Sequence, residues 1–331
     1  MSGLGEIAFI ADYLAPLATH PAALGLKDDA ALITGVAPSG LVVTADASVA
    51  GVHFFEEDDP GDAAYKALAT NVSDLAAKAA KPLFYTLTLA LAVAPSPEWA
   101  ERFVCGLSRA QRDFGISLLG GDTVTARGAW WMSISAFGEA SARGLVPRGG
   151  AQPGDCLYVS GTLGDAALGL ALRLGKADFE QALSTEDRDF LLRRYLYPEP
   201  RLALSAALAI HASAAMDISD GLALDLERMC RASSVTAEVA VSSIPLSKAA
   251  NAALQTTPRS MSTILSGGDD YEILAAVPPR SAASFEAAGR EAGVSLARIG
   301  SVKAGGGTPV FIKPDGVQFV LDVRGFEHFG Q

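Results

Sequence analysis

The chain has 331 residues, half of them apolar, and a formal net charge of −11 at pH 7. This length suits two domains of ordinary size, and the apolar fraction excludes an intrinsically disordered chain. The acidic balance excludes nucleic acid as a partner, because that binding needs a basic face, and it equally excludes an anionic membrane surface. The longest apolar run, residues 83–94, is too short to span a bilayer.

Two further features predict a cytoplasmic protein. The N-terminus lacks a basic region followed by an apolar stretch, so we expect no signal peptide. The cysteines, Cys105, Cys156 and Cys230, are far apart and form no CxxC pair. That usage is typical of buried core thiols in a reducing compartment.

Helical and strand periodicities alternate along the first half of the chain. Tyr65, Leu68, Val72 and Leu75 recur at helical spacing, whereas residues 130–137 alternate between apolar and polar types as a strand does. In chain order we expect helix 5–18, strands 30–33 and 41–45, helix 63–79, strand 83–93, helix 98–114, and strands 116–119 and 130–137.

Residues 143–155 contain four glycines and two prolines, which predicts a boundary between domains 1–147 and 148–331. We read Gly305–Gly307 as a turn between two late strands. The elements expected after the boundary are strand 156–160, helices 163–174, 188–195 and 202–211, strand 214–216, helix 222–231, and strands 271–277, 297–302, 310–312 and 319–321. The fold class is therefore α/β or α+β in two halves.

Short clusters of carboxylates among small residues are the main chemical signal. They contain Asp28-Asp29, Asp46, Asp74, Asp122, Asp217 with Asp220, and Asp269-Asp270. Crowded carboxylates without basic neighbours repel one another, so a positive charge should balance them. Mg²⁺ prefers oxygen ligands and commonly bridges one or two carboxylates to substrate phosphates. The clusters therefore predict a site for a polyphosphate.

The expected elements place most of these acids where strands end. Asp46 closes a predicted strand, Asp122 follows another through a glycine pair, and Asp217 follows a third. Asp220 lies where the next helix begins, whereas Asp74 lies within a helix. Strand ends and helix N-termini commonly carry phosphate and metal sites.

Simpler interpretations remain open for individual acids. Asp74 precedes Lys78 by four residues and could form a surface ion pair. Asp220 could cap the following helix, and Gly120-Gly121-Asp122 could form only a turn. No Walker A sequence, protein-kinase glycine-rich loop or HExxH motif occurs, so carboxylate-held metals would replace what those motifs supply.

The ordered set of motifs resembles the thiamine-monophosphate kinases, within the wider superfamily of aminoimidazole ribonucleotide synthetase (PurM-like). The similarity runs from about residue 3 to the C-terminus. The motifs that carry it are Asp28-Asp29-Ala30-Ala31, Asp46 with Gly51-Val52-His53-Phe54, Asn71-Val72-Ser73-Asp74, Gly120-Gly121-Asp122-Thr123, Arg148 before Pro153-Gly154-Asp155, Tyr197-Pro198-Glu199-Pro200-Arg201, Asp217-Ile218-Ser219-Asp220-Gly221, Gly268-Asp269-Asp270-Tyr271-Glu272 and Gly325-Phe326-Glu327-His328-Phe329.

The resemblance implies an ATP-dependent phosphorylation of thiamine monophosphate to thiamine diphosphate in the cytoplasm. It also implies a homodimer formed through an N-terminal α/β domain, a C-terminal α+β domain, several Mg²⁺ ions and room for a monovalent cation. The implied metal ligands are Asp29, Thr44, Ala45, Asp46, Asp74, Asp122, Asp217 and Asp220. The implied ATP contacts are Gly121, Asp122, Arg148 and Ser219, and the implied substrate contacts are His53, Asp269 and Val323. No covalent nucleophile is expected, and Asp46, Asp122 and Arg148 would support the transfer.

Several residues depart from the family's pattern. Lys27 stands in place of a usual glycine, and Ala45 in place of Thr or Ser, so Ala45 could reach a metal only through its backbone. Asp269 replaces the commoner Glu, and Val323 replaces an aromatic residue. Two alternatives therefore stay open: a PurM-like enzyme acting on another small phosphorylated substrate, and a nucleotide-binding regulator without turnover.

Overall fold

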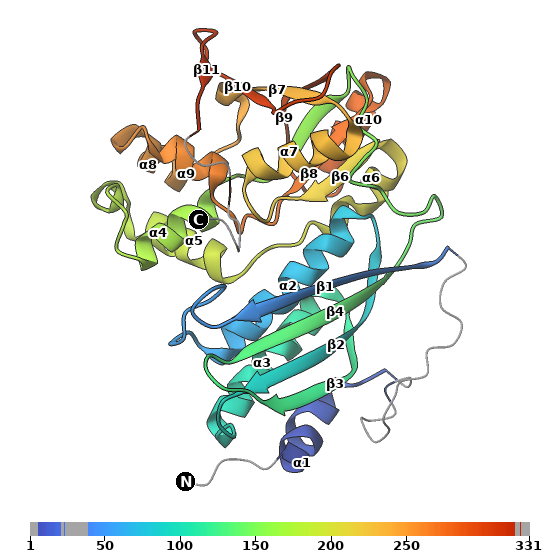
Figure 1. Cartoon of the computed structure of the whole chain (residues 1–331), viewed down its shortest axis with the longest axis vertical. Helices are drawn as coiled ribbons and strands as arrows, with labels where there is room; N and C mark the ends of the chain where they lie inside the picture. The colour runs from blue at the N-terminus through green and yellow to red at the C-terminus, as the bar shows by residue number, and fades with distance from the viewer. Residues whose placement is uncertain (1–5, 21–22, 24–38, 322–324, 326–331) are drawn as a thin grey trace. The chain divides into compact units, whose positions relative to one another are not determined.

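A computed structural model describes residues 6–20, 23, 39–321 and 325, and it divides the chain into two compact units (Figure 1). The first unit is Met1–Leu75 with Ala80–Gly144, and the second is Ala76–Ala79 with Leu145–Gln331. The predicted strand 30–33, Asp28, Asp29, Val323 and residues 326–329 lie outside the described residues.

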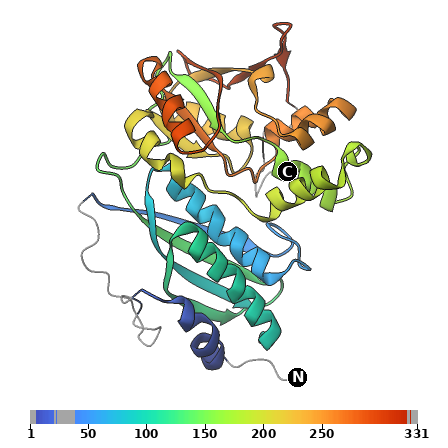
Figure 2. The ribbon, with the colours of Figure 1, turned by 180° about the vertical axis from the view of Figure 1, so that it is seen from behind.

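The described part of the first unit is a four-stranded sheet with the order β1-β4-β2-β3, covered on one face by two helices (Figure 2). β2 and β3 are parallel, whereas β4 is antiparallel to both β1 and β2. The elements are α1 (Glu6–Phe9), η1 (Ile10–Leu14), η2 (Ala15–Leu17), β1 (Leu41–Val49), α2 (Pro60–Ala77), β2 (Lys81–Leu91), α3 (Pro97–Phe114), β3 (Ser117–Thr125) and β4 (Trp131–Glu139).

The alternation of β4 shows which face of this sheet is packed. Met132, Ile134 and Ala136 are buried, whereas the residues between them are only half-buried. Successive side chains on a strand point to opposite faces, so these three side chains line the face that α2 and α3 cover. Leu68 and Leu75 of α2 are fully buried on the same side. We call this the helix face, and the opposite one the open face.

Two predicted strands are longer in the structure, and this corrects the placement of two acids. β1 continues to Val49, so Asp46 lies within a strand instead of closing one. β3 continues to Thr125, so Asp122 also lies within a strand, and the interpretation of Gly120-Gly121-Asp122 as a turn is wrong. Both extensions come from the partner strands, because β4 and β2 offer unbroken backbone pairing along these stretches.

The described part of the second unit is built around a seven-stranded sheet with the order β11-β10-β7-β9-β5-β8-β6. Its elements are β5 (Cys156–Ser160), α4 (Asp165–Arg173), η4 (Glu180–Ala182), α5 (Thr185–Leu196), η5 (Leu202–Leu204), α6 (Ser205–His211), β6 (Ala214–Asp217), α7 (Leu222–Ser233), β7 (Thr236–Ala240), η6 (Val241–Ser243), α8 (Lys248–Thr256), α9 (Ser260–Ser266), β8 (Ile273–Val277), α10 (Pro279–Glu291), β9 (Leu296–Lys303), β10 (Val310–Ile312) and β11 (Gln318–Phe319).

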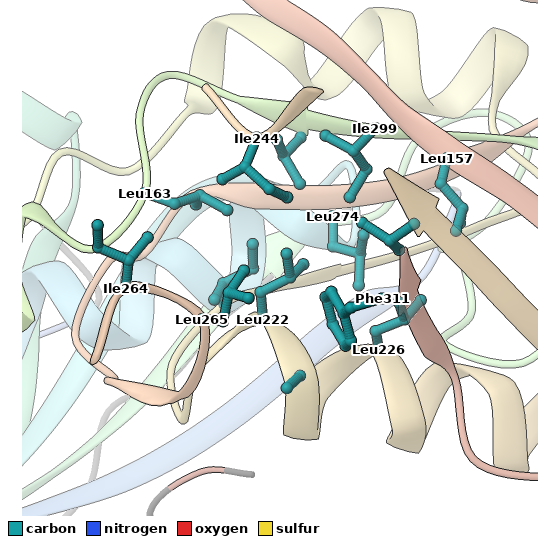
Figure 3. Close-up of a cluster of buried hydrophobic side chains, with 14 of the residues drawn as sticks. Leu157, Leu163, Leu222, Leu226, Ile244, Ile264, Leu265, Leu274, Ile299 and Phe311 are labelled. Carbon is teal, nitrogen blue, oxygen red and sulfur yellow. The ribbon is translucent and has the colours of Figure 1, made fainter. Parts of the chain in front are cut away.

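The core of this unit forms where side chains of the sheet meet those of the helices and loops around it (Figure 3). Leu157 and Leu274 come from the central strands, and Leu222 and Leu226 come from α7. Each side chain of this kind contributes about 1.5–3 kcal/mol when it leaves water. The glycine run 305–307 lies between β9 and β10, which confirms the predicted turn.

The segment Ala76–Ala79 belongs to the second unit although the first unit flanks it in sequence on both sides. Ala77 and Ala79 pack in a buried cluster with Tyr158 and Phe285. The Lys78 Nζ donates a hydrogen bond to the carbonyl oxygen of Ala215 at 2.7 Å. The chain therefore enters the second unit once at the end of α2 and again after Gly144.

Two general expectations have mixed outcomes. Cys156 and Cys230 are buried as predicted, but Cys105 is exposed on α3, so the prediction of a third buried thiol is wrong. The helical periodicity that suggested α3 did not indicate which of its small residues face the solvent. In the described part of the chain, every helix is too short or too polar to cross a membrane.

Candidate functional site

Three of the predicted metal ligands gather on the helix face of the first unit. Thr44 pairs with Ala136 and Asp46 pairs with Ile134, and both partners are buried on that face. The hydroxyl of Thr44 donates a hydrogen bond to the carboxylate of Asp74, which α2 presents from above the sheet. A strand and a helix therefore bring Thr44, Asp46 and Asp74 to one side of the first unit.

Ala45 lies between these residues and points the other way. It pairs with the half-buried Ser135, so its methyl group lies on the open face. Between Thr44 and Asp46, Ala45 therefore offers only backbone atoms to the helix face. A metal contact through the backbone of Ala45 stays a prediction.

Gly121 and Asp122 lie on β3, which is separated from β1 by β4 and β2. Gly121 pairs with Leu87, and a Cβ at this position would stand 1.7 Å from the Leu87 carbonyl oxygen, so only glycine fits. Asp122 pairs with Thr88, which places its exposed side chain on the open face. The first unit thus does not bring Asp122 together with Asp46, because the faces differ and the strands are about 14 Å apart across three strand spacings.

His53 is fixed in a tight loop that follows β1. The backbone N–H of Val49 donates to the ring Nδ1 of His53 at 3.0 Å, and the backbone N–H of His53 donates to the Val49 carbonyl oxygen at 2.9 Å. The Lys66 Nζ donates to the carbonyl oxygen of His53 at 3.3 Å, and Phe54 packs on Trp130. Because Nδ1 accepts a hydrogen bond, the neutral imidazole carries its proton on Nε2.

The second unit holds another group of predicted residues where β6 meets α7. Asp217 is the last residue of β6, and Ser219 and Asp220 form the connection to the helix. Both backbone N–H groups of that connection donate to the Asp225 carboxylate, at 3.0 Å from Ser219 and 2.9 Å from Asp220. Burial raises the pKa of Asp225 to about 6.

The interpretation of Asp220 as a helix cap is wrong. Gly221 occupies the N-cap of α7, without a side-chain cap. The Asp220 carboxylate instead accepts from the Arg228 guanidinium, which also contacts Asp225 at 2.8 Å. The other simple interpretation, an ion pair between Asp74 and Lys78, is replaced by contacts with Thr44 and the Ala215 carbonyl oxygen.

Asp269 lies beside this connection, and backbone hydrogen bonds join the two segments. Its N–H donates to the Ser219 carbonyl oxygen at 2.9 Å, and the Tyr271 N–H donates to the Ile218 carbonyl oxygen at 2.8 Å. A Cβ at Gly268 would stand 2.3 Å from the Ser219 carbonyl oxygen, so the two segments approach as closely as backbones can. The predicted ATP residue Ser219 and the predicted substrate residue Asp269 are therefore neighbours.

The remaining predicted residues are less informative. Arg148 is exposed on the segment that precedes β5. Asp29 and Val323 lie outside the described residues. Within the described ranges, no group of three or more His, Cys, Asp or Glu side chains is arranged to hold a metal ion.

The structure also shows supporting residues that sequence reasoning missed. Asp225 and Arg228 organise the connection that carries Ser219 and Asp220. Lys66, which is 5% exposed, supports the His53 loop from α2. Asp225 and Arg228 could have been found in the sequence, because they lie in the first turns of a helix that follows predicted ligands. Nothing local in the sequence links Lys66 to His53.

Both halves of the chain match known families. The family model of AIR synthase related protein, N-terminal domain, matches residues 27–140, and that of the C-terminal domain matches residues 152–313. A thiamine-monophosphate kinase from Caulobacter vibrioides is 42% identical over 313 residues, which cover 93% of this chain and 87% of that protein.

Solved structures give the same result. The crystal structure of thiamine-monophosphate kinase from Stenotrophomonas maltophilia K279a has a TM-score of 0.82 and 37% identity, covering 95% of this chain and 98% of its own. A structure described as AaThiL complexed with AMPPCP and TMP has a TM-score of 0.74 and 29% identity, covering 87% of both chains. The predicted two-domain PurM-like fold is thus confirmed, and the chain belongs to the thiamine-monophosphate kinase family.

Proposed function

We propose that this kinase transfers the γ-phosphate of ATP to thiamine monophosphate and releases thiamine diphosphate. The observation that carries the proposal is the similarity, over most of the chain, to a structure that holds AMPPCP and TMP together. The 42% identity to a curated thiamine-monophosphate kinase supports it as well. A cytoplasmic location and a monovalent cation stay predictions of this proposal.

The residues present fit Mg²⁺ as the metal. Thr44, Asp46 and Asp74 supply hydroxyl and carboxylate oxygens on one face, and these are the ligands that Mg²⁺ prefers. Asp217 and Asp220 would supply carboxylates to Mg²⁺ in the second unit, and Asp29 and the Ala45 backbone are further proposed ligands. Asp122 lies on the open face and would serve a different ion from Thr44, Asp46 and Asp74. Mg²⁺ commonly keeps waters and binds one or two carboxylates plus phosphates, so it needs no cage of three carboxylates. When bound, it would neutralise charge on the phosphates.

The chain's own residues would then position two anions. Gly121, Arg148 and Ser219 would contact ATP, where a guanidinium suits bidentate binding of phosphate. His53 would donate from Nε2 to the acceptor, and Asp269 and Val323 would contact the rest of thiamine monophosphate. The acceptor phosphate is already ionised near neutral pH, so the proposed in-line transfer requires no general base.

We also propose that the open face of the first unit's sheet pairs with a second copy of the chain. Leu41, Val43 and Val124 lie on this face by their register and are 40%, 56% and 38% exposed. Exposed apolar side chains on one sheet face favour a protein partner.

The proposed reaction predicts a specific pattern of products. Purified protein with ATP and Mg²⁺ should form thiamine diphosphate and ADP from thiamine monophosphate, and neither product from free thiamine. Chromatography of both products checks this. ADP formed with another phosphorylated acceptor, but not with thiamine monophosphate, would favour the alternative PurM-like enzyme. ATP binding without turnover of any acceptor would favour a regulator.

The metal proposal predicts that the contact between Thr44 and Asp74 matters for turnover. Asp74→Asn should lower kcat by at least about 100-fold, because a preorganised charge beside the phosphates is lost. Thr44→Val should raise the Mg²⁺ concentration needed for half-maximal rate. Asp113→Asn is the control, because Asp113 accepts from Tyr65 elsewhere on the helix layer. Wild-type Mg²⁺ dependence in both site variants would exclude this assignment.

The tautomer of His53 predicts different outcomes for its two amide replacements. His53→Asn keeps an acceptor near Nδ1 for Val49, but it loses the Nε2–H donor. In His53→Asn the KM for thiamine monophosphate should rise about tenfold to hundredfold, because that is the loss expected when a hydrogen bond to a charged group is removed. The KM for ATP should stay unchanged. His53→Gln should recover part of this affinity. An unchanged acceptor KM in His53→Asn would refute the assignment, and Val52→Ala in the same loop is the control.

The dimer proposal predicts that a charge on the open face separates the subunits. Wild-type protein should sediment as a dimer, and Val43→Lys should shift it toward monomer because a buried lysine would lose its hydration. Val93→Lys, at a 77% exposed position outside the sheet, is the matched control. A wild-type monomer at micromolar concentration would contradict the proposal.

A further inference from the structure

A buried carboxylate with two arginine partners, Glu272, lies three positions after the proposed substrate residue Asp269. Glu272 has no exposed surface, and it accepts hydrogen bonds from Arg201 Nε at 2.7 Å, from Arg194 Nη2 at 3.0 Å and from Ser160 Oγ at 2.6 Å. A second nitrogen of Arg201, Nη2, also contacts Glu272, so that pair is bidentate. A buried charge is retained only when it is paired and fully hydrogen-bonded, and this one is.

A second group of contacts holds Asp270, two positions before Glu272. Asp270 is buried, and both of its carboxylate oxygens accept from the Gly164 N–H at 2.9 Å. The 4% exposed Arg194 also donates to the Asp270 carbonyl oxygen at 3.3 Å. One guanidinium, that of Arg194, therefore contacts both Asp270 and Glu272.

The backbone on both sides of Asp270 is in an unfavourable conformation. Asp269 and Tyr271 both adopt positive φ, at 70° and 50°, although neither is glycine. Such a conformation costs about 1–2 kcal/mol per residue, so it persists only where surrounding contacts determine it. The side chain of Asp269 is thus aimed by a segment whose shape depends on the fixed residues Asp270 and Glu272.

The neighbouring connection that carries Ser219 has a separate support. Asp225 accepts its two backbone N–H groups, and Arg228 pairs with Asp220 and Asp225. The contacts of Arg194 and Arg201 are instead with Glu199, Asp270 and Glu272. The proposed nucleotide residue and the proposed acceptor residue are therefore supported by two different groups of charged side chains. The two segments are also joined by backbone hydrogen bonds, which the N–H groups of Asp269, Tyr271 and Ile218 donate to the carbonyl oxygens of Ser219, Ile218 and Glu272, respectively.

We propose that Arg194, Arg201 and Glu272 form a positioning cluster for Asp269, which determines the affinity for the phosphate-bearing acceptor and leaves that for ATP nearly unchanged. This inference rests on the proposed function, because Asp269 contacts the acceptor only if that function holds. The three residues act through the backbone of residues 269–272 and do not touch the acceptor. Arg201 is the best test position, because its side chain is 21% exposed and its replacement should disturb the fold less than that of Arg194, which is 5% exposed.

The kinetic test compares variants of the two supports. Arg201→Met should raise the KM for thiamine monophosphate about tenfold to hundredfold, the effect of displacing a positioned group by about 1 Å, with the KM for ATP nearly unchanged. Arg201→Lys keeps the charge but loses the bidentate fork, so it should fall between Arg201→Met and wild type. Arg228→Gln should show the reverse pattern, affecting ATP first. Arg188→Gln, from an exposed pair with Glu180, should affect neither.

A second measurement does not depend on the substrate. Hydrogen exchange of the free protein should be faster at residues 268–272 in Arg201→Met and Arg201→Lys. It should be unchanged at Ser219 and Asp220, whose N–H groups donate to Asp225. Equal protection at 268–272 in wild type and both variants would overturn the inference, as would equal increases in both KM values. Absence of thiamine diphosphate from the wild-type reaction would instead refute the proposed function, while the exchange pattern still decides whether the cluster positions Asp269.

Discussion

The two-residue alternation of β1 decides which polar groups of the first unit can act together. Thr44 and Asp46 both reach the helix face because they are two positions apart on the strand, and there Thr44 meets Asp74 from α2. Shifting the pairing of β1 and β4 by one residue would place both side chains on the open face. Nine paired positions, from Leu41 with Glu139 to Val49 with Trp131, fix this register.

The second unit positions its polar residues by a different means, namely contacts with carboxylates and guanidiniums, of which Asp225 and Glu272 are buried. Strand alternation contributes little there, because Ser219, Asp220 and Asp269 all lie in connections between elements. Backbone hydrogen bonds join these connections to one another, and carboxylates and guanidiniums add further contacts that fix them. Removing one member of a buried pair leaves an uncompensated charge, which commonly costs about 3–5 kcal/mol. The geometry of these segments is therefore tied to the stability of the unit.

Sequence patterns predicted elements well where periodicity was strong, as for α2, α3, β4 and β5. They shortened β1 and β3, because Asp46 and the glycine pair before Asp122 look like loop residues when partner strands are unknown. They missed β7, α8, α9 and α10. The alanine-rich α8 has no clear apolar face in sequence, although Ser247 caps it by accepting from the Ala250 N–H.

The candidate site was predictable only where its signal is local. The motif around Ser219 and Asp220 indicated a strand-to-helix connection, and the structure has one. Arg201 and Glu272, by contrast, are 71 residues apart, and no spacing rule relates them. The position of Asp122 on the open face could not be predicted either, because it depends on a bulge in the pairing of β2 with β3.

The double passage of the chain between its two units affects how the protein can be divided. A cut after Gly144 would leave Ala76–Ala79 on the wrong fragment, and the remainder would lose Ala77 and Ala79 from a buried cluster and Lys78 from the Ala215 carbonyl oxygen. The two units are therefore not interchangeable modules. Gene fusion, fragment expression or recombination at the glycine-rich boundary would separate sequence that the fold keeps together.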